Sequence, residues 1–536
     1  MKKYMLKRIL FSIFSLFVVV MVVMLLVYTL IDRRVIFQSD ETWIKRKGND
    51  QIAYEYQQFQ RFGYLEYTNY TEFVSKKFKE IDGENYAKNP GYKAALDAIK
   101  KVFDDESLRA VDNPVLQEFI TTYENNGYDI VFIPIEHWAN GRAKTGSKAY
   151  LLATKENNPF VRLGRYIAGF FSFETTSDVK DPELTEDQRG VHVEGDPYSG
   201  LFAVVGSGTT HKYLLYFDSR FPFIHQNWFK INLGTSYTRY RGQEITQVIN
   251  EPTGIITSSR QQYPTMIGTD EYADTAIDFH SLTYNENWNV LPDDLKAEFP
   301  DRYTTFSFHR EGLSMLENSF VIGLAATIIA YLLGLPLGIL MARRKDKLGD
   351  KLGNLYIIFI MAVPSLAYIF MFAAIGTRLF NLPYKFASAE VPILAYILPT
   401  ISLALPSIGS LMKWMRRYMI DQMNSDYVKF ARAEGLSERE IYNVHISRNA
   451  LIYIVHGIPG SILGCLTGAI ITERVYAVPG VGNLLTIAIN QHDNGIIIAC
   501  TVFYTFLSIV SIILGDLLLA KYDPRISLSS SKGGGR

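Results

Sequence analysis

The chain has 536 residues, with 54 Lys and Arg against 54 Asp and Glu, so its formal net charge is zero; 48% of its residues are hydrophobic. This composition excludes disordered, collagen-like and low-complexity chains, and the neutral balance argues against a general nucleic-acid binder. Two cysteines exclude a disulfide scaffold and a four-cysteine zinc site.

The first element along the chain is a run of 23 residues without a charge, Ile9–Ile31. About 20 such residues cross the hydrocarbon core of a bilayer as a helix. Five more uncharged runs of 22 to 26 residues crowd the last 220 residues: Asn318–Ala342, Leu352–Thr377, Val391–Met412, Asn449–Thr472 and Asn494–Gly515. Buried helices of a soluble core are the alternative, but six runs separated by charged loops predict a polytopic membrane protein. The first run is too long for a signal peptide and has no small-x-small cleavage site, so we expect an uncleaved helix.

The distribution of Lys and Arg between the runs predicts the orientation. The N-terminus carries four basic residues, the 343–351 loop five and the 413–448 loop seven, whereas 378–390 holds two and 473–493 one. We therefore expect both termini and both basic loops in the cytoplasm. The whole chain divides into four predicted parts: a tail and first helix (1–31), an external domain (32–317), a helical core (318–520) and a cytoplasmic C-terminal tail (521–536).

The long segment 32–317 carries 31 basic and 42 acidic residues, a net charge of −11. A helix is predicted near Asn89–Val102, and strands near Tyr128–Ile135, Lys148–Thr154, Leu201–Val205 and Lys212–Phe217. The expected fold is an α+β domain without disulfides, which serves as a docking or enclosing surface or simply as a solvated spacer.

Signatures of catalysis are missing from the sequence. It has no Gly-x-x-x-x-Gly-Lys-Ser/Thr loop, no His-Glu-x-x-His, no Gly-x-Ser-x-Gly and no Cys-x-x-Cys. We therefore expect no ATP hydrolysis by the common route, no metal site and no cofactor in this chain. His456 lies inside the fifth run and is interpreted as a neutral histidine packed between helices, although a functional role stays open.

Helix-bending and small residues are frequent in the runs instead. Proline frees a backbone carbonyl, and glycine at every fourth position lets a second helix approach closely. These patterns favour a bent bundle that lines a path, with ordinary packing as the alternative. The residues are Pro336, Pro364, Pro399, Pro406 and Pro459, the pair Gly334 and Gly338, and the stripe Gly460, Gly464 and Gly468.

The basic 413–448 loop has an amphipathic pattern with two predicted helices. The first ends at Gly435, and the second begins after Ser437, which forms a capping box with Glu440. The loop is either a solvated surface hairpin or a knob that inserts into a cytoplasmic partner.

Several segments of the chain resemble the permeases of oligopeptide and dipeptide ABC importers. The loop residues Ala431, Arg432, Ala433, Glu434, Gly435, Leu436 and Ser437, followed by His445, Arg448, Asn449 and Ala450, resemble the family's coupling loop. Glu473, Pro479, Gly480 and Gly482 match its external Glu…Pro-Gly-x-Gly segment. Asp523-Pro524-Arg525-Ile526 and Leu233-Gly234-Thr235-Ser236-Tyr237 are also similar to family segments.

The chain departs from the common pattern in its long external insertion, which resembles the Gram-positive Ami/Opp variant and its AmiC/OppB-like subunit. His211 to Phe217, leading to Phe221-Pro222-Phe223, supports that match. In the loop, Glu434 stands where the family usually has Lys, and the family's Glu-Ala-Ala triplet reads Lys429-Phe430-Ala431. Docking therefore depends on Ala431, Gly435 and the position of the loop.

The resemblance implies a type I ABC importer permease with six transmembrane helices, which imports oligopeptides. The implied partners are a homologous AmiD/OppC-like permease, a lipid-anchored peptide-binding protein, and two ATPases that bind ATP and Mg²⁺ and engage the 424–442 loop. Dipeptide, glutathione or nickel import stays open within the family; a membrane-anchored receptor or hydrolase is the alternative outside it.

Overall fold

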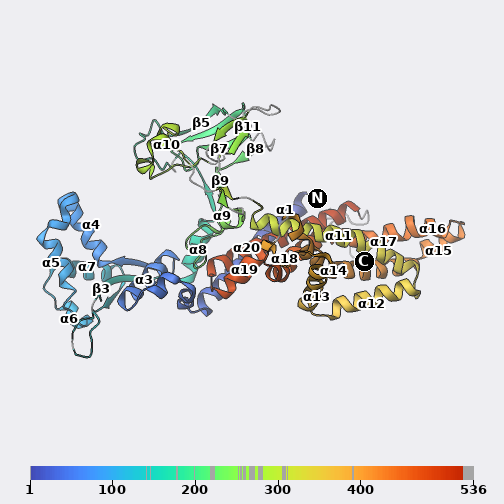
Figure 1. Ribbon diagram of the computed structural model, residues 1–536, viewed down its shortest axis with the longest axis horizontal. Coiled ribbons are helices and arrows are strands. Elements are labelled where there is room, and N and C mark those ends of the chain that lie inside the picture. The colour runs from blue at the N-terminus through green and yellow to red at the C-terminus, as the bar shows by residue number, and fades with distance from the viewer. Residues whose placement is uncertain are drawn as a thin grey trace.

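The protein is elongated, with a helical bundle at one end, one lobe at the other end and a second lobe beside the middle (Figure 1). A computed structural model describes the chain over residues 2–140, 142–144, 146–176, 179–197, 199–217, 224–251, 253, 256–257, 261–264, 272–275, 280, 282–304, 309–310, 312–388 and 392–522. The Asp523–Ile526 and Phe221–Phe223 motifs and almost all of the C-terminal tail lie outside the described residues.

The bundle contains four helices that are long and apolar enough to cross a membrane: α1 (Lys2–Leu30), α11 (Met315–Arg343), α14 (Ile397–Met423) and α20 (Asn494–Tyr522). Two further crossings are bent helix pairs. In one, α12 (Leu348–Ala362) meets α13 (Ser365–Phe380) at 113°; in the other, Glu438–Val455 meets α18 (Ile458–Tyr476) at 50°. With each pair counted once, the described residues give the expected six spans.

The run Leu352–Thr377, predicted as one crossing with a helix-bending proline, breaks into two helices at Val363 and Pro364. Val363 is extended (φ −79°, ψ 130°), since the ring of a following proline disfavours the helical conformation. Pro364 is extended too and precedes the first residue of α13. A uniform apolar run therefore conceals a sharp corner.

Short elements connect the spans. Between α13 and α14 lie two 3₁₀ turns, η5 (Phe386–Ser388) and η6 (Pro392–Tyr396). Between α14 and α18 lie α15 (Asp426–Ala433), α16 (Glu438–Glu440), the π-helix η7 (Ile441–Ile446) and α17 (Ser447–Val455). Helix α19 (Val481–Asn490) precedes α20.

Glycine permits a close contact between two helices of the bundle, α11 and α14. A Cβ atom on Gly334 would lie 2.8 Å from Leu411 Cβ, and one on Gly338 would lie 2.9 Å from Met412 O. No carbon atom fits at such distances, so both helices depend on the missing side chains. Around this contact, buried residues of α11, α12, α13, α14 and α18 form the main core.

The distal lobe, drawn in blue at the left of Figure 1, is a layer of helices on a three-stranded antiparallel sheet of order β1-β3-β2. Tyr70, Phe119 and Leu151 are buried between the layers. Its elements are η1 (Arg33–Ser39), α2 (Glu41–Lys45), α3 (Asn49–Arg61), β1 (Leu65–Asn69), α4 (Tyr70–Asp82), η2 (Gly83–Lys88), α5 (Pro90–Ala98), α6 (Asp105–Arg109), α7 (Pro114–Asn125), β2 (Asp129–Ile133) and β3 (Tyr150–Glu156). The predicted helix and the first two predicted strands are confirmed.

The second lobe is built on an antiparallel sheet of order β5-β6-β7-β8, and its strands β6 and β7 confirm the other two strand predictions. Its elements, with those that link it to the bundle, are α8 (Pro159–Ala168), β4 (Phe171–Phe173), β5 (Gly190–Gly195), β6 (Phe202–Ser207), β7 (Tyr213–Phe217), β8 (Ile224–Gln226), β9 (Phe229–Ile231), α9 (Ile245–Asn250), β10 (Ile256–Thr257), β11 (Gln261–Pro264), β12 (Tyr272–Thr275), η4 (Trp288–Val290), α10 (Asp293–Glu298) and β13 (His309–Arg310). The expected α+β region between the first two crossings is therefore present, in two lobes.

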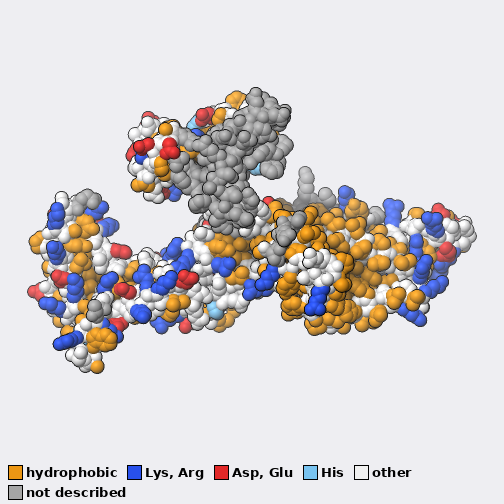
Figure 2. Space-filling model, viewed as in Figure 1, with side chains coloured by type: hydrophobic (Ala, Val, Ile, Leu, Met, Phe, Trp, Pro, Cys, Tyr) orange, Lys and Arg blue, Asp and Glu red, His pale blue; other side chains and the backbone are white. Residues whose placement is uncertain are grey.

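The start of α1 and the end of α20 lie at the same end of the bundle, because Arg8 forms a 2.6 Å ion pair with Asp516. Hydrophobic side chains cover the visible face of the bundle, and Lys and Arg gather at the end that carries α15 and α16 (Figure 2). An apolar band bounded by a basic end is the surface expected of a chain that crosses a membrane.

Candidate functional site

A cavity of about 530 Å³ opens among α11, α13, α14, α17 and α18. None of its lining side chains carries a charge. Serine, threonine and tyrosine hydroxyls alternate with apolar groups along its walls: Thr327 and Tyr331 from α11, Ser365 and Tyr368 from α13, Ser402, Ser407, Ser410 and Tyr418 from α14, Tyr453 from α17, and Ser461 and Thr472 from α18. A wall of neutral donors and acceptors can bind an amide-rich ligand without selecting for its charge.

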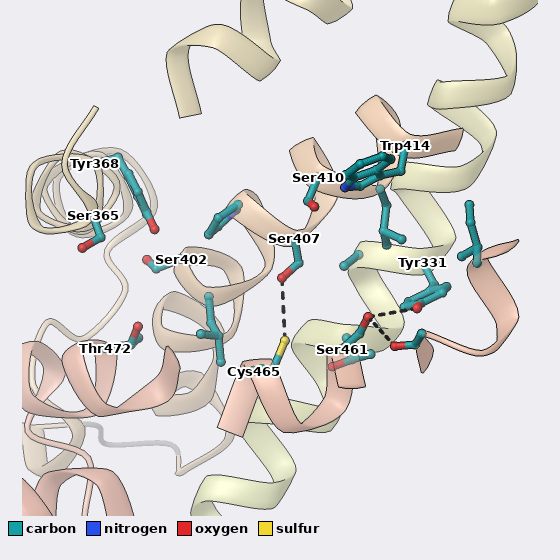
Figure 3. A pocket seen from close by; sticks show the side chains of 18 of the residues that line it. Tyr331, Ser365, Tyr368, Ser402, Ser407, Ser410, Trp414, Ser461, Cys465 and Thr472 are labelled. Atoms are coloured by element: carbon teal, nitrogen blue, oxygen red, sulfur yellow. Dashed lines mark hydrogen bonds between the residues drawn. The ribbon is translucent and has the colours of Figure 1, made fainter. Parts of the chain in front are cut away.

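The hydroxyl groups come from different helices and lie around one space (Figure 3). Tyr331 and Ser461 share a 3.0 Å hydrogen bond between α11 and α18. Ser407 Oγ lies 3.7 Å from Cys465 Sγ, so α14 and α18 also meet across the cavity. These contacts fix the walls on one side of the space.

The shape of the cavity follows from the bends of the helices. Pro406 lies inside α14 and lines the cavity, while Pro364 stands directly before Ser365 at the corner between α12 and α13. Pro399 and Pro459 are buried near the starts of α14 and α18, and Pro336 is exposed on α11. Of the five prolines, Pro406 lines the space and Pro364 lies at the corner beside it.

At Gly460 and Gly464, the glycine stripe of α18 makes no close contact with another helix of this chain. A Cβ atom on Gly464 would meet nothing within 4 Å, and one on Gly460 would meet only Ser511 Oγ at 3.9 Å. Gly464 lines the cavity, and the surroundings of Gly468 are not described. The stripe leaves this side of α18 without side chains, next to the open cavity.

His456 was expected to pack between helices, but its side chain is exposed in this chain. Its backbone makes the close contact, because a Cβ atom on Gly515 of α20 would lie 2.8 Å from His456 O. The glycine on the neighbouring helix, and not the imidazole, permits the approach.

The loop that resembles the family's coupling loop, residues 424–442, is called the coupling loop below and extends from the basic end of the bundle as a helical hairpin (Figure 1). Gly435 has φ +83° and follows Glu434, the C-cap of α15. The Ser437 hydroxyl accepts a hydrogen bond from the Glu440 backbone amide at 3.3 Å, but the reciprocal bond of the predicted capping box, from the Ser437 amide to the Glu440 side chain, is not formed. Both predicted helix boundaries are confirmed, but α16 has only three residues before the π-helix begins.

The two sides of α15 differ. Val428 and Ala431 are buried in a cluster that also contains residues of η7, α17 and the ends of α11 and α14, so the small side chain of Ala431 permits packing within this chain. Arg432, Ala433, Glu434 and Ser437 are exposed, Leu436 is half-buried, and an added Cβ on Gly435 would meet nothing within 4 Å. Phe430, which the site prediction did not include, is 65% exposed. Its signal in the sequence is an aromatic residue on the charged face of an amphipathic helix.

The π-helix η7 joins this hairpin to the bundle. Arg343, at the end of α11, donates a hydrogen bond to the Asn443 side chain and lies over the Tyr442 ring. The Ser447 hydroxyl donates to Tyr442 O at 2.7 Å. Wider turns of this kind often mark functional positions in helices, and this one lies where the loop meets α11 and α17.

Glu473 holds the external motif together. Its buried carboxylate accepts hydrogen bonds from Ser319 Oγ at 2.7 Å and from the Asn483 amide at 2.9 Å, in the first turn of α19. Any Cβ on Gly480 would collide with this carboxylate, and one on Gly482 would lie 2.7 Å from Ile470 Cα. A carboxylate at a helix N-terminus is favourable, and both glycines make room for it.

Asp493, a residue that sequence reasoning missed, fixes the loop that holds Ser236, Tyr237 and Thr238 to the start of α20. Its fully buried carboxylate accepts from Ser236 Oγ at 2.6 Å and from the Tyr237 and Thr238 amides at 2.9 Å each. The segment that resembled a family motif upstream, Leu233–Tyr237, is thus a loop that wraps this carboxylate. An acidic residue at the start of an uncharged run was the available signal.

Among the described residues, no group of three or more His, Cys, Asp or Glu side chains is placed to hold a metal ion. The cavity wall itself was also missed, although Ser407, Ser410, Trp414 and Tyr418 recur at intervals of three and four residues. Polar residues at helical spacing inside an uncharged run were the signal.

Comparison with known proteins gives a consistent result. The profile of the family described as "Binding-protein-dependent transport system inner membrane component" matches residues 334–528. The oligopeptide transport system permease protein AmiC of Streptococcus pneumoniae is 33% identical over the full length of both chains. The dipeptide transport system permease protein DppB of Lactococcus lactis is 34% identical, over 39% of this chain and 69% of its own length. A solved amino acid ABC transporter chain superposes on 40% of this chain, and 92% of its own, at 18% identity and a TM-score of 0.31.

Proposed function

The chain belongs to the binding-protein-dependent permeases of peptide ABC importers, and from this membership we propose that it forms one half of the membrane path for oligopeptides. The observation that carries the proposal is the uncharged cavity lined with hydroxyl groups. Peptides share a backbone of amide donors and acceptors but differ in side-chain charge. Neutral hydroxyls can satisfy the backbone of many peptides, whereas fixed charges would select among them.

The second half of the path is a homologous permease, AmiD/OppC-like. The cavity is open, and Gly464 at its edge leaves room for another helix. Small residues on an exposed transmembrane face favour close helix association. The stripe Gly460, Gly464 and Gly468 is therefore the proposed side of contact.

Energy enters through the coupling loop. Two partner ATPases that bind ATP and Mg²⁺ engage residues 424–442, with exposed Phe430, Arg432, Ala433 and Glu434 as contacts and Gly435 and Ser437 shaping the turn. Buried Ala431 ties the loop to α11 and α14, so that movement of the loop moves the cavity walls. The chain itself has no catalytic role in this proposal.

The proposed topology places both termini and the coupling loop in the cytoplasm and residues 32–317 outside the cell. The shared end of α1 and α20, held by Arg8 and Asp516, and the basic residues around the coupling loop support it. A lipid-anchored peptide-binding protein delivers substrate on the external side.

The test is uptake by cells that carry this chain as their only permease of its type. Uptake of labelled oligopeptides is expected, with labelled dipeptides, glutathione and nickel measured in parallel. Uptake of one of these three compounds without uptake of oligopeptides would show that the compound, and not an oligopeptide, is the substrate. A Ser410→Trp change, which fills the cavity, is expected to lower uptake by at least about tenfold. Leu332→Trp on the 68% exposed outer face of α11 is the matched control.

A further inference from the structure

A second cavity, of about 630 Å³, lies between α12 and α14 near the end that carries the coupling loop. It shares no lining residue with the hydroxyl-lined cavity and takes no part in the proposed path. We refer to it as the α12–α14 groove. Its walls are Asn354, Ile357, Ile358, Met361 and Ala362 from α12, and Lys413, Arg416, Arg417, Ile420 and Asp421 from α14.

The two walls of the groove differ, because one is mainly apolar and the other is mainly basic. The wall from α12 consists mainly of aliphatic side chains, and Ile358 and Met361 are 64% and 59% exposed. The wall from α14 carries three basic residues just beyond the uncharged run that ends at Met412. An apolar wall next to basic side chains matches a molecule with an acyl chain and an anionic headgroup.

The charges in the groove are not all available. Arg416 is engaged by the buried Asp350, through two hydrogen bonds of 2.6 and 2.7 Å. Lys413 and Arg417 flank Trp414, with their charged groups 5.9 and 5.4 Å from its ring, and neither has an ion-pair partner among the described residues. Asp421 also lines the groove, so one positive charge remains unbalanced.

We propose that the α12–α14 groove binds an anionic phospholipid of the leaflet on the coupling-loop side. Lys413 and Arg417 bind the phosphate, and Ile358 and Met361 contact an acyl chain. A phosphodiester with an uncharged alcohol headgroup, such as phosphatidylglycerol, carries the one negative charge that the groove leaves unbalanced. Basic pockets between transmembrane helices on the cytoplasmic side bind anionic headgroups in this way. Trp414 beside both basic groups is typical of the membrane interface.

The test uses the whole transporter, purified with its partner subunits. The complex is equilibrated with equal amounts of phosphatidylglycerol and phosphatidylcholine, stripped with detergent, and analysed for retained lipid by native mass spectrometry. Phosphatidylglycerol is expected to be retained selectively. Because each basic group contributes roughly a fivefold preference, Lys413→Gln combined with Arg417→Gln should reduce this retention by on the order of tenfold or more.

Two variants control the experiment. Lys345→Gln with Lys347→Gln removes two basic residues at the same end of the bundle but outside the groove, and should retain phosphatidylglycerol. Lys413→Arg with Arg417→Lys keeps both charges and should also retain it, which separates loss of charge from loss of assembly. Equal retention of the two lipids, or unchanged retention in the Gln double variant, would overturn the proposal. So would disulfide cross-linking of a cysteine at Ile358 to the second permease, because that would show a protein covering the groove.

Discussion

Glycine has different roles in the external region and in the bundle. Of eleven described glycines with positive φ, ten lie before Leu313, in turns and helix ends of the external lobes. The exception is Gly435 in the coupling loop. Inside the transmembrane helices, Gly334, Gly338 and Gly515 have ordinary helical φ and are packed against the backbone or Cβ atoms of other helices.

The difference shows that the two regions use glycine in different ways to favour one structure over its alternatives. The external lobes use glycine for a backbone shape that other residues adopt with strain. The bundle cannot use burial from water to choose between helix pairs, because lipid is as apolar as leucine; it relies on close approach instead. Glycine is thus required in the lobes for its backbone conformation, and in the bundle because it has no side chain.

Gly435 is the strongest test, because it has the positive φ that is typical of glycines in the lobes but lies in the coupling loop. Gly435→Asp should abolish peptide uptake, since it strains the turn and places a charge on the proposed ATPase contact. Peptide capture outside should be unchanged. Gly349→Asp is the matched control, because Gly349 is an unhindered glycine at the same end of the bundle with no positive φ. Normal uptake by the Gly435 variant would remove the loop from the mechanism.

Asp493 tests the contact between the start of α20 and the loop that holds Ser236, Tyr237 and Thr238. Asp493→Ala leaves the Ser236 hydroxyl and the Tyr237 and Thr238 amides without their buried acceptor, which should cost roughly 4 kcal/mol of unfolding free energy. Thermal unfolding of the purified complex, with proteolysis between 232 and 240, measures the effect. Asp493→Asn keeps one acceptor oxygen, so its stability should lie between that of the unchanged protein and that of Asp493→Ala. Equal stability of all three proteins would contradict the anchoring role.

Gly338 tests the steric role of glycine in the bundle. Gly338→Val should separate α11 from α14 and lower the unfolding free energy by about 3 kcal/mol, because Met412 O and Met415 Cβ occupy the required space. Detergent-dependent unfolding of the complex measures this loss. Gly349→Val, where nothing lies within 4 Å, should cost far less. An equal loss of unfolding free energy in the two variants would show that helix propensity, and not packing, determines the effect.

Gly63 tests the conformational role outside. It has φ +72° and open space around an added Cβ, so Gly63→Ala should cost about 1 kcal/mol through backbone strain alone. Thermal unfolding of the complex measures it, with Gly164→Ala in α8 as the control at an open helical position. A stabilising effect of Gly63→Ala would contradict the conformational role of Gly63.

The smallest expected effect concerns the charged contacts of the distal lobe. The hydrogen bond from Tyr128 at 2.6 Å, together with Arg165, holds the pKa of Glu66 below its ordinary value. Its contribution is therefore present above the ordinary carboxyl pKa and lost as the pH falls through the lowered one. Glu66→Gln should lower the unfolding temperature slightly at pH 7, and the difference should shrink toward pH 3. Exposed Glu80→Gln should show no such trend.

The sequence alone predicted the six crossings, an α+β region between the first two of them with four of its strands, and the ends of two helices in the coupling loop. These features depend on local properties: apolar length, alternation, and the capping chemistry of Gly435 and Ser437. Pro364 and the glycine pair were visible as signals, but not the 113° corner or the identity of the helix that Gly334 and Gly338 contact.

Only the tertiary structure brought together residues that are distant in the chain. It placed Ser402, Tyr331 and Ser461 around one cavity, and turned Ala431 inward and Phe430 outward on the same helix. It joined Asp493 to a loop more than 250 residues earlier. Composition and spacing fix how far a segment reaches and which face is apolar. The partners of each face depend on close packing among helices that are all similarly apolar, which a single run of residues does not encode.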